Sequence, residues 1–233
     1  SENEEKVSEY NDIDAALYYS LCQARELAYT ICQDRTMKIR HRAVLLLDFA
    51  KKLQKKLKKN KLNKKLDAYK DVQYRNERIE KLEKKYASYK KTTVVLRKWL
   101  DIYDRLEHIK PEWQGILSEL SGYVDRKMPD VKAGAVIVNE RDYEYEHLMV
   151  YYVYRYFLRA VFDENVLEKI KLSCTALIMQ ELLGAAYCYR DGCFDFEKQI
   201  TLMRIYSKET EHSEENLDEL YRNFKKNKAF STK

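Results

Sequence analysis

Two arginines with helical spacing are the first residues in this sequence that suggest chemistry. Arg155 and Arg159 lie four residues apart in the mostly apolar segment YYVYRYFLRAVF, so a helix would place both on one face. A buried guanidinium group needs an anionic partner, because an isolated buried charge is strongly destabilising. Glu181 is the single charged residue in the apolar segment LIMQELLGAAY and is therefore the expected partner.

Two interpretations of these three residues remain open. In the structural one, a buried ion pair holds two core helices in register. In the functional one, the charges form a pocket that grips the carboxylate or phosphate of a ligand. Ion-pair networks often imitate functional sites, which favours the structural interpretation.

A second candidate is the segment YSKETEHSEENL, which places Glu211 beside His212. These two residues would form an acid–base pair if a pocket lay next to them. The segment is also typical of a helix junction, in which Ser213 caps the following helix and the adjacent glutamates favour its positive end. The junction interpretation leads, because it needs no further assumption.

The tyrosines suggest a third kind of site. The chain has 20 tyrosines, and several cluster between residues 143 and 156. Aromatic faces attract ammonium groups. We expect most of these tyrosines to pack in the core and a few to line a lysine-binding site.

Other common sites lack their motifs. No glycine-rich phosphate loop and no HExxH motif occurs. The odd number of cysteines and the lack of a CxxC pair predict a reducing compartment and no metal site in this chain. The cysteines are Cys22, Cys32, Cys174, Cys188 and Cys193.

The stretch AKKLQKKLKKNKLNKK holds nine lysines between Ala50 and Lys65. Without them, 35 basic residues stand against 38 acidic ones, so the excess positive charge is local. The lysines fall opposite an apolar stripe, which favours a solvated helix face over a nucleic-acid surface. No Trp or Phe accompanies them, which argues against membrane binding. Docking to an acidic protein partner stays open.

Composition predicts an all-α fold, a bundle of about eight helices, because only five Gly and two Pro are present to end helices. Two apolar helices, one reaching Asp163 and one spanning 171–189, are expected at the centre of the C-terminal half. We expect a first helix from Asp12 or Asp14, a second over 39–60, and one long helix or two collinear ones over 62–109. Pro111 is expected in the first turn of the next helix. Amphipathic helices near 196–209 and 214–225 close the chain.

The segment MPDVKAGAVIVNE is the clearest linker, since it contains Pro129 and Gly134. We therefore predict an N-terminal helical layer over 1–127, a linker over 128–139 and a C-terminal layer over 140–233, or one continuous domain. No run is long and apolar enough to span a bilayer, and the acidic start does not look like a signal peptide. We expect a cytoplasmic protein.

The C-terminal half resembles the C-terminal region of bacterial flagellin lysine-N-methylases. The resemblance lies in YEYEHLMVYYVYRYFLRAVFDENVLEKIKLSCTALIMQELL, whose YR-aromatic-F core is residues 154–157, and in IYSKETEHSEENLDEL, which contains Glu211 and His212. The segment DAALYYSLCQARELAYTICQDRTMKIRHRAVLLLDFAKKL is similar to the middle region of that family.

The resemblance implies methyl transfer from S-adenosylmethionine to lysines of flagellin. It implies a cysteine-rich N-terminal segment with an iron–sulfur or zinc centre, which we expect outside this chain. It marks Tyr154, Glu211 and His212 as candidate catalytic residues. The candidate cofactor-binding residues are Tyr151, Arg155, Arg159 and Glu181.

An alternative is a non-catalytic helical module that only binds a protein partner, with flagellin again the first candidate. The absence of a cofactor loop and the lysine-rich face favour this alternative. The polar residues within the two most apolar helices favour the enzyme. Nucleic-acid binding through residues 50–65 ranks below both.

Overall fold

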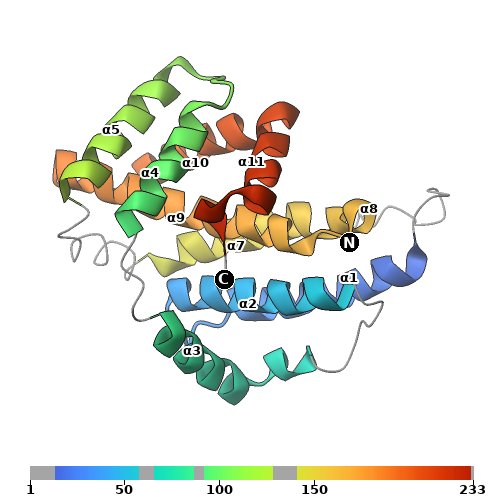
Figure 1. Cartoon of the computed structure of the whole chain (residues 1–233). Helices are drawn as coiled ribbons and strands as arrows, with labels where there is room; N and C mark the ends of the chain where they lie inside the picture. The colour runs from blue at the N-terminus through green and yellow to red at the C-terminus, as the bar shows by residue number, and fades with distance from the viewer. Residues whose placement is uncertain (1–13, 58–65, 87–91, 128–140, 232–233) are drawn as a thin grey trace. The chain divides into compact units, whose positions relative to one another are not determined.

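The computed structural model describes residues 14–57, 66–86, 92–127 and 141–231. Every regular element in these ranges is an α-helix or a 3-10 helix (Figure 1). The prediction of an all-α, multi-helix fold is therefore confirmed. None of the described helices combines the length and apolar character that crossing a bilayer requires.

The chain divides into two compact units, each built from two separate stretches. Unit 1 comprises Ser1–Lys85 and Tyr145–Cys174, and unit 2 comprises Tyr86–Glu144 and Thr175–Lys233. This partition differs from the expected layers over 1–127 and 140–233, and the expected linker over 128–139 lies outside the described residues. Helices α7 (Asp142–Tyr156) and α9 (Val166–Asp191) each contribute to both units, so packing rather than chain order defines the units.

Unit 1 begins with two helices that pack against each other, α1 (Ala15–Cys32) and α2 (Ile39–Leu57) (Figure 1). Asp14 is the N-cap of α1, as predicted, and its carboxylate accepts the Leu17 N–H at 3.0 Å. The apolar stripes expected on both helices are buried, apart from the half-buried Leu17. The buried members are Leu21, Ala24, Ala28, Ile31, Leu46, Phe49, Leu53 and Leu57.

The remaining elements of unit 1 include η2 (Asp67–Lys70), α3 (Val72–Tyr86), η4 (Phe157–Arg159) and α8 (Ala160–Asp163). Helix α1 packs on η2, η4 and α8. Of the two forms predicted over 62–109, one long helix or two collinear ones, the single long helix is wrong, because the extended backbone of Asp71 separates η2 from α3. The next helix, α4 (Thr92–Asp104), belongs to unit 2.

Unit 2 pairs α4 with α5 (Pro111–Lys127), and α10 (Phe196–Glu211) with α11 (Glu214–Lys226). Pro111 opens α5 as predicted, and the apolar residues Trp113, Ile116, Leu117 and Leu120 of this helix are buried. The short η5 (Lys228–Phe230) packs on α4 and α11. There Trp99 stacks on Phe230 at 4.8 Å and donates a hydrogen bond to the Ala229 carbonyl at 2.9 Å.

Helix α9 is buried along most of its length, as expected for a central helix. Within unit 2, a side chain at Gly184 would place its Cβ 2.8 Å from the Phe194 ring, so only glycine fits beside this aromatic residue. The helix ends before Gly192, whose φ of +74° is a conformation that glycine adopts without strain.

Helix α7 is less buried than its sequence suggests. Tyr143, Tyr151 and Tyr154 are exposed, and the chain tightens into η4 directly after Tyr156. Phe162, in the short α8, is 71% exposed. The interpretation of this segment as wholly buried is therefore wrong.

Candidate functional site

Four of the predicted site residues lie together along α7 and η4 of unit 1. Tyr151 and Tyr154 are 39% and 55% exposed. Arg155 and Arg159 hold their guanidinium carbons 5.7 and 5.2 Å from the centre of the Tyr156 ring, and Arg155 donates a hydrogen bond to the Tyr156 hydroxyl at 3.1 Å. This tyrosine–arginine face combines aromatic surface with two positive charges.

The two arginines are exposed, whereas the sequence analysis treated them as buried. The reason is that α7 keeps one side open, so their long side chains reach solvent instead of crossing a core. Their charges therefore need no buried anionic partner. Exposed guanidinium groups remain good donors to the carboxylate or phosphate of a ligand.

The other three predicted residues belong to unit 2. Glu181 is only 6% exposed on α9. Glu211 is half-buried at the last position of α10, and His212 is exposed as the C-cap of that helix. The structure thus divides the seven candidates into two groups, and their catalytic and cofactor roles stay predictions.

The junction between α10 and α11 has the structural role that the sequence also allowed. The Ser213 hydroxyl accepts the Asn216 N–H at 3.2 Å and so caps α11. The Asn216 amide donates to the carbonyls of Glu107 and Glu209 at 2.8 and 2.7 Å. The cap interpretation of Ser213 is confirmed.

The acidic residue that organises this part of unit 2 is Glu209. It is 1% exposed, and its carboxylate accepts the N–H groups of Ile109 and Lys110 at 2.9 and 2.6 Å. A buried carboxylate with two backbone donors is stable without a basic partner. Glu209 therefore fixes the turn before α5 to α10.

Unit 1 contains a buried ion-pair network centred on Glu146. The Arg42 guanidinium donates to its carboxylate at 2.7 Å, and both side chains are under 5% exposed. Arg35 binds the same carboxylate through Nε and Nη2, and its shortest nitrogen-to-oxygen distance is 2.8 Å. The hydrogen bond from Arg35 lowers the pKa of Glu146, burial opposes this effect, and Arg42 lowers the pKa further.

A second buried pair joins Asp34, next to α1, to Arg75 of α3 at 2.7 Å. Arg75 also donates to the carbonyls of Tyr69 and Lys70, which ties α3 to η2. Burial alone would raise the pKa of Asp34, but hydrogen bonds from Thr36 and Arg75 lower it below its usual value.

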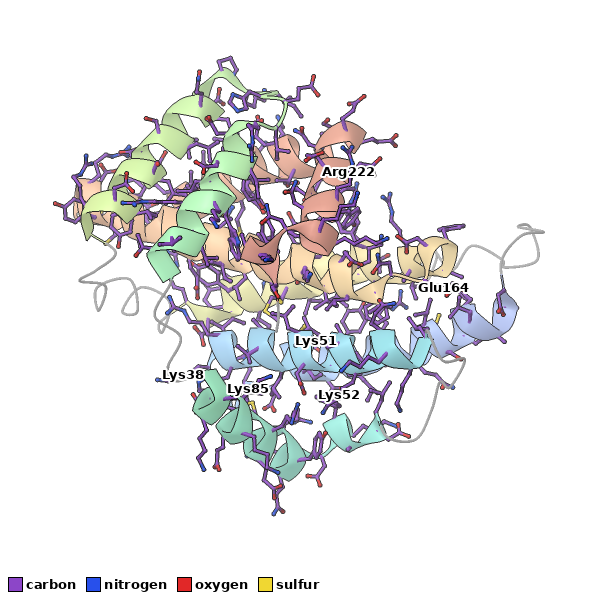
Figure 2. The ribbon with its side chains drawn as sticks, viewed as in Figure 1. Lys38, Lys51, Lys52, Lys85, Glu164 and Arg222 are labelled. Atoms are coloured by element: carbon purple, nitrogen blue, oxygen red, sulfur yellow. The ribbon has the colours of Figure 1, made fainter. Side chains whose placement is uncertain are left out.

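The third charged cluster of unit 1 surrounds Lys52, one of the lysines of the basic stretch. Its ammonium lies 4.9 and 5.5 Å from the ring centres of Tyr69 and Tyr74. It donates to the Tyr74 hydroxyl at 2.9 Å and lies 3.2 Å from the Asp48 carboxylate. Figure 2 labels Lys52 on α2, beside η2 and α3, the elements that carry these tyrosines.

Asp48 anchors this cluster. Arg78 binds it through two hydrogen bonds of 2.7 Å, and the Tyr69 hydroxyl donates a third. Burial would raise the pKa of Asp48, but these hydrogen bonds and the nearby positive charges lower it to about 2. The carboxylate therefore stays ionised at neutral pH. We call Tyr69, Tyr74 and Asp48 the lysine cage.

The solvated-face interpretation of the lysine stretch fits part of the helix. Lys55 is exposed, and Lys51 and Lys56 are half-buried. Lys52 differs because it is held by named aromatic and acidic partners. Residues 58–65 of the stretch lie outside the described residues.

The cysteines are free thiols in different surroundings. Burial raises the pKa of Cys32 to about 12, and it also raises that of Cys174. Cys193 is exposed. Within the ranges that the structure describes, no group of three or more His, Cys, Asp and Glu side chains is arranged to hold a metal ion.

The fold and these charged clusters define an all-α protein in which several buried charged residues connect elements that are distant in sequence. Residues 25–233 match the family model described as the FliB lysine N-methylase C-terminal domain. The match covers most of the chain, so the chain belongs to this family, as the resemblance indicated. No curated protein and no solved structure matches the chain.

Neither the lysine cage nor the Glu146 network is evident from the sequence pattern. One signal was present: Asp48 is the single acidic residue in the apolar run AVLLLDFA, just as Glu181 is in its own segment. Tyr69 and Arg78 carry no such mark, because their neighbours in the sequence are mostly polar or charged. Their role follows from the packing of η2 and α3 against α2.

Proposed function

We propose that this chain is the C-terminal domain of a protein-lysine N-methylase that transfers methyl groups from S-adenosylmethionine to lysines of flagellin. The family match over residues 25–233 is the observation that carries this proposal. The fold supports it only indirectly, since helical domains serve many functions.

The reaction sets three requirements. The acceptor lysine must lose its proton before its nitrogen attacks, so its pKa must fall or a base must lie nearby. The nitrogen must line up behind the bond that breaks. When bound, S-adenosylmethionine supplies a methyl group on a positively charged sulfur, which aromatic faces or carboxylates hold well.

The tyrosine–arginine face supplies groups that suit the cofactor. Arg155 and Arg159 are exposed and flank one ring, so their donors fit the carboxylate of the methionine part. Tyr151 and Tyr154 offer partly exposed aromatic faces for the sulfonium. In the same proposal, Tyr154 also helps to orient the acceptor amine.

Unit 2 supplies the acid–base candidates. Glu211 or His212 is the proposed acceptor of the proton that leaves the lysine, and Glu181 the proposed source of negative charge for the cofactor; these three roles rest on the sequence pattern alone.

The proposal is tested by calorimetric titration of the chain with S-adenosylmethionine and with S-adenosylhomocysteine. We expect saturable binding that Arg155→Ala and Arg159→Ala each weaken at least about tenfold, the value of one good ionic hydrogen bond. Arg222→Ala is the matched control, since Arg222 is an exposed arginine of α11 paired with Glu219 in the same helix. Absence of binding by a well-folded chain would overturn the cofactor site.

A second candidate function is a non-catalytic domain that binds the protein substrate. It is favoured by the large exposed aromatic residues of unit 1, Tyr19 at 63%, Tyr154 at 55% and Phe162 at 71%. A chain that captured flagellin without binding the cofactor, and that lost capture in Phe162→Ser, would favour this candidate. Capture that was unchanged in that variant would count against it.

A further inference from the structure

The lysine cage has the composition of a site for an organic cation. Two tyrosine rings face the Lys52 ammonium from within 6 Å of their centres, and a carboxylate that stays ionised lies on a third side. This combination is the one by which proteins recognise quaternary and methylated ammonium groups. The cage lies wholly within unit 1.

We propose that the lysine cage binds the methylated ammonium group of a protein lysine, and that Lys52 occupies this site as a built-in substitute when no ligand is present. The ligand class is thus an Nε-methylated lysine side chain. The family match does not assign such a site to these residues.

The cage is held by contacts that do not involve its occupant. The Tyr69 hydroxyl and both Arg78 nitrogens bind Asp48, while Arg75 holds the Tyr69 carbonyl. Phe49 supports the Tyr69 ring edge-to-face at 5.3 Å. Tyr74 packs edge-to-face on Tyr69 at 5.2 Å. Removal of Lys52 therefore leaves the Tyr69 ring, the contact of Tyr74 with that ring and the carboxylate, and Arg78 still balances the charge of Asp48.

Lys52 itself is a replaceable occupant. Its side chain is 33% exposed, so Lys52 is not enclosed by the fold. The side chain is long and flexible, and a partly exposed ion pair adds only about 0–1 kcal/mol to stability. A competing cation can therefore displace it at small cost.

The hydrogen-bond acceptors of the cage predict which methylation state binds best. Nζ of Lys52 contacts both the Tyr74 hydroxyl and Asp48, so a ligand nitrogen that keeps an N–H can donate to one of them. A trimethylated nitrogen keeps its charge but has no N–H. An unmethylated one is strongly hydrated and gains less from the rings. We expect the dimethylated form to bind best.

That the ligand is a lysine methylated by a member of this family rests on the proposed function. The binding of a methylammonium group to the cage does not depend on it. The test therefore uses synthetic ligands and needs no catalysis. The full chain carrying Lys52→Ala is titrated with blocked lysine derivatives that are unmethylated, monomethylated, dimethylated or trimethylated, and binding is followed by NMR.

We expect saturable binding to Lys52→Ala, tightest for the dimethylated derivative. The intact chain should bind about two- to sixfold more weakly, because the tethered Lys52 competes for the cage and is held there by only about 0–1 kcal/mol. Lys55→Ala is the matched control: Lys55 is an exposed lysine one turn away, and this variant should behave like the intact chain.

Two further variants connect the binding to the cage. Tyr74→Ala in the Lys52→Ala chain should abolish binding, whereas Tyr74→Phe should keep binding and shift the preference toward the trimethylated form. Circular dichroism and thermal unfolding establish that each variant is folded. A folded Lys52→Ala chain that binds none of the derivatives, or binding that Tyr74→Ala leaves unchanged, would overturn the proposal whatever the cofactor titration gives.

Discussion

The two units of this chain stabilise their buried polar groups in different ways. Unit 1 buries Asp34, Asp48 and Glu146, and each is paired with an arginine. Unit 2 holds its buried Glu209 with backbone N–H groups and pairs the Tyr103 and Tyr206 hydroxyls at 2.7 Å. Among the other ion pairs of its described part, Arg97 with Asp125 lies at the surface, while the buried Glu144 pairs with Arg141 only three residues away, at 2.6 Å, so this pair joins no distant elements.

Because the two units hold their buried polar groups differently, we expect different kinds of change to destabilise them. A buried ion pair joins elements that are distant in sequence, but the loss of one partner leaves an uncompensated charge. A carboxylate bound by backbone groups depends instead on hydrogen-bond geometry. Unit 1 should therefore respond most to pH and charge removal, and unit 2 to the loss of single acceptors or hydroxyls.

The largest effect is expected from Arg42→Met. This change leaves Glu146 buried with one partner fewer and removes the bonds to the carbonyls of Met37 and Cys32. We expect a loss of about 3–5 kcal/mol in the free energy of unfolding, measured by urea denaturation. Arg35→Met is the control, because the Arg35 side chain is 69% exposed and its loss should cost clearly less. Equal losses would contradict the assigned importance of burial.

Acid should destabilise unit 1 before unit 2. The pKa values of Asp34, Asp48 and Glu146 are lowered in the folded chain, so their stabilisation is complete above the unfolded values near 4 and is lost as pH falls through the folded values. The lowering to about 2 for Asp48 corresponds to about 2 kcal/mol.

Urea unfolding followed between pH 5 and pH 2 measures this loss, with the Asp48→Asn variant as the comparison. Asp48→Asn should be less stable at neutral pH, and its free energy of unfolding should fall less steeply as the pH is lowered. If Asp48→Asn left the pH dependence of the unfolding free energy unchanged, the pKa of Asp48 would be the same in the folded and unfolded chain.

In unit 2, Glu209→Gln should cost about 1–3 kcal/mol, because the amide offers one acceptor oxygen where the carboxylate offers two. The lost bond should also speed hydrogen exchange at the Ile109 or Lys110 amide, which NMR resolves. Glu197→Gln, at an exposed position of α10, should stay within about 1 kcal/mol of the parent chain. Unchanged exchange at both amides would remove Glu209 from its assigned role.

The smallest effect should come from the tyrosine pair. Tyr103→Phe or Tyr206→Phe should each cost about 1 kcal/mol, since the remaining hydroxyl loses its partner in a buried site. The double variant should cost less than the sum of the two, because no hydroxyl is then left unpaired. A double-mutant cycle by urea unfolding measures this coupling, and strict additivity would contradict it.

The sequence by itself determined the all-α class, several helix boundaries and the family. Asp14, Pro111 and Ser213 mark helix starts through local hydrogen bonding and backbone preference, which depend only on neighbouring residues. The apolar stripes of α1, α2 and α5 follow from helical periodicity.

Tertiary structure alone decided how the charges pair and how the chain divides. Arg42 and Glu146 are 104 residues apart, and the cage around Lys52 joins α2 to η2 and α3. Arg155 and Arg159 were assigned to a core because their neighbours are apolar, yet α7 keeps that side exposed. Periodicity fixes which residues share a helix face, but only the packing of distant helices fixes what that face meets.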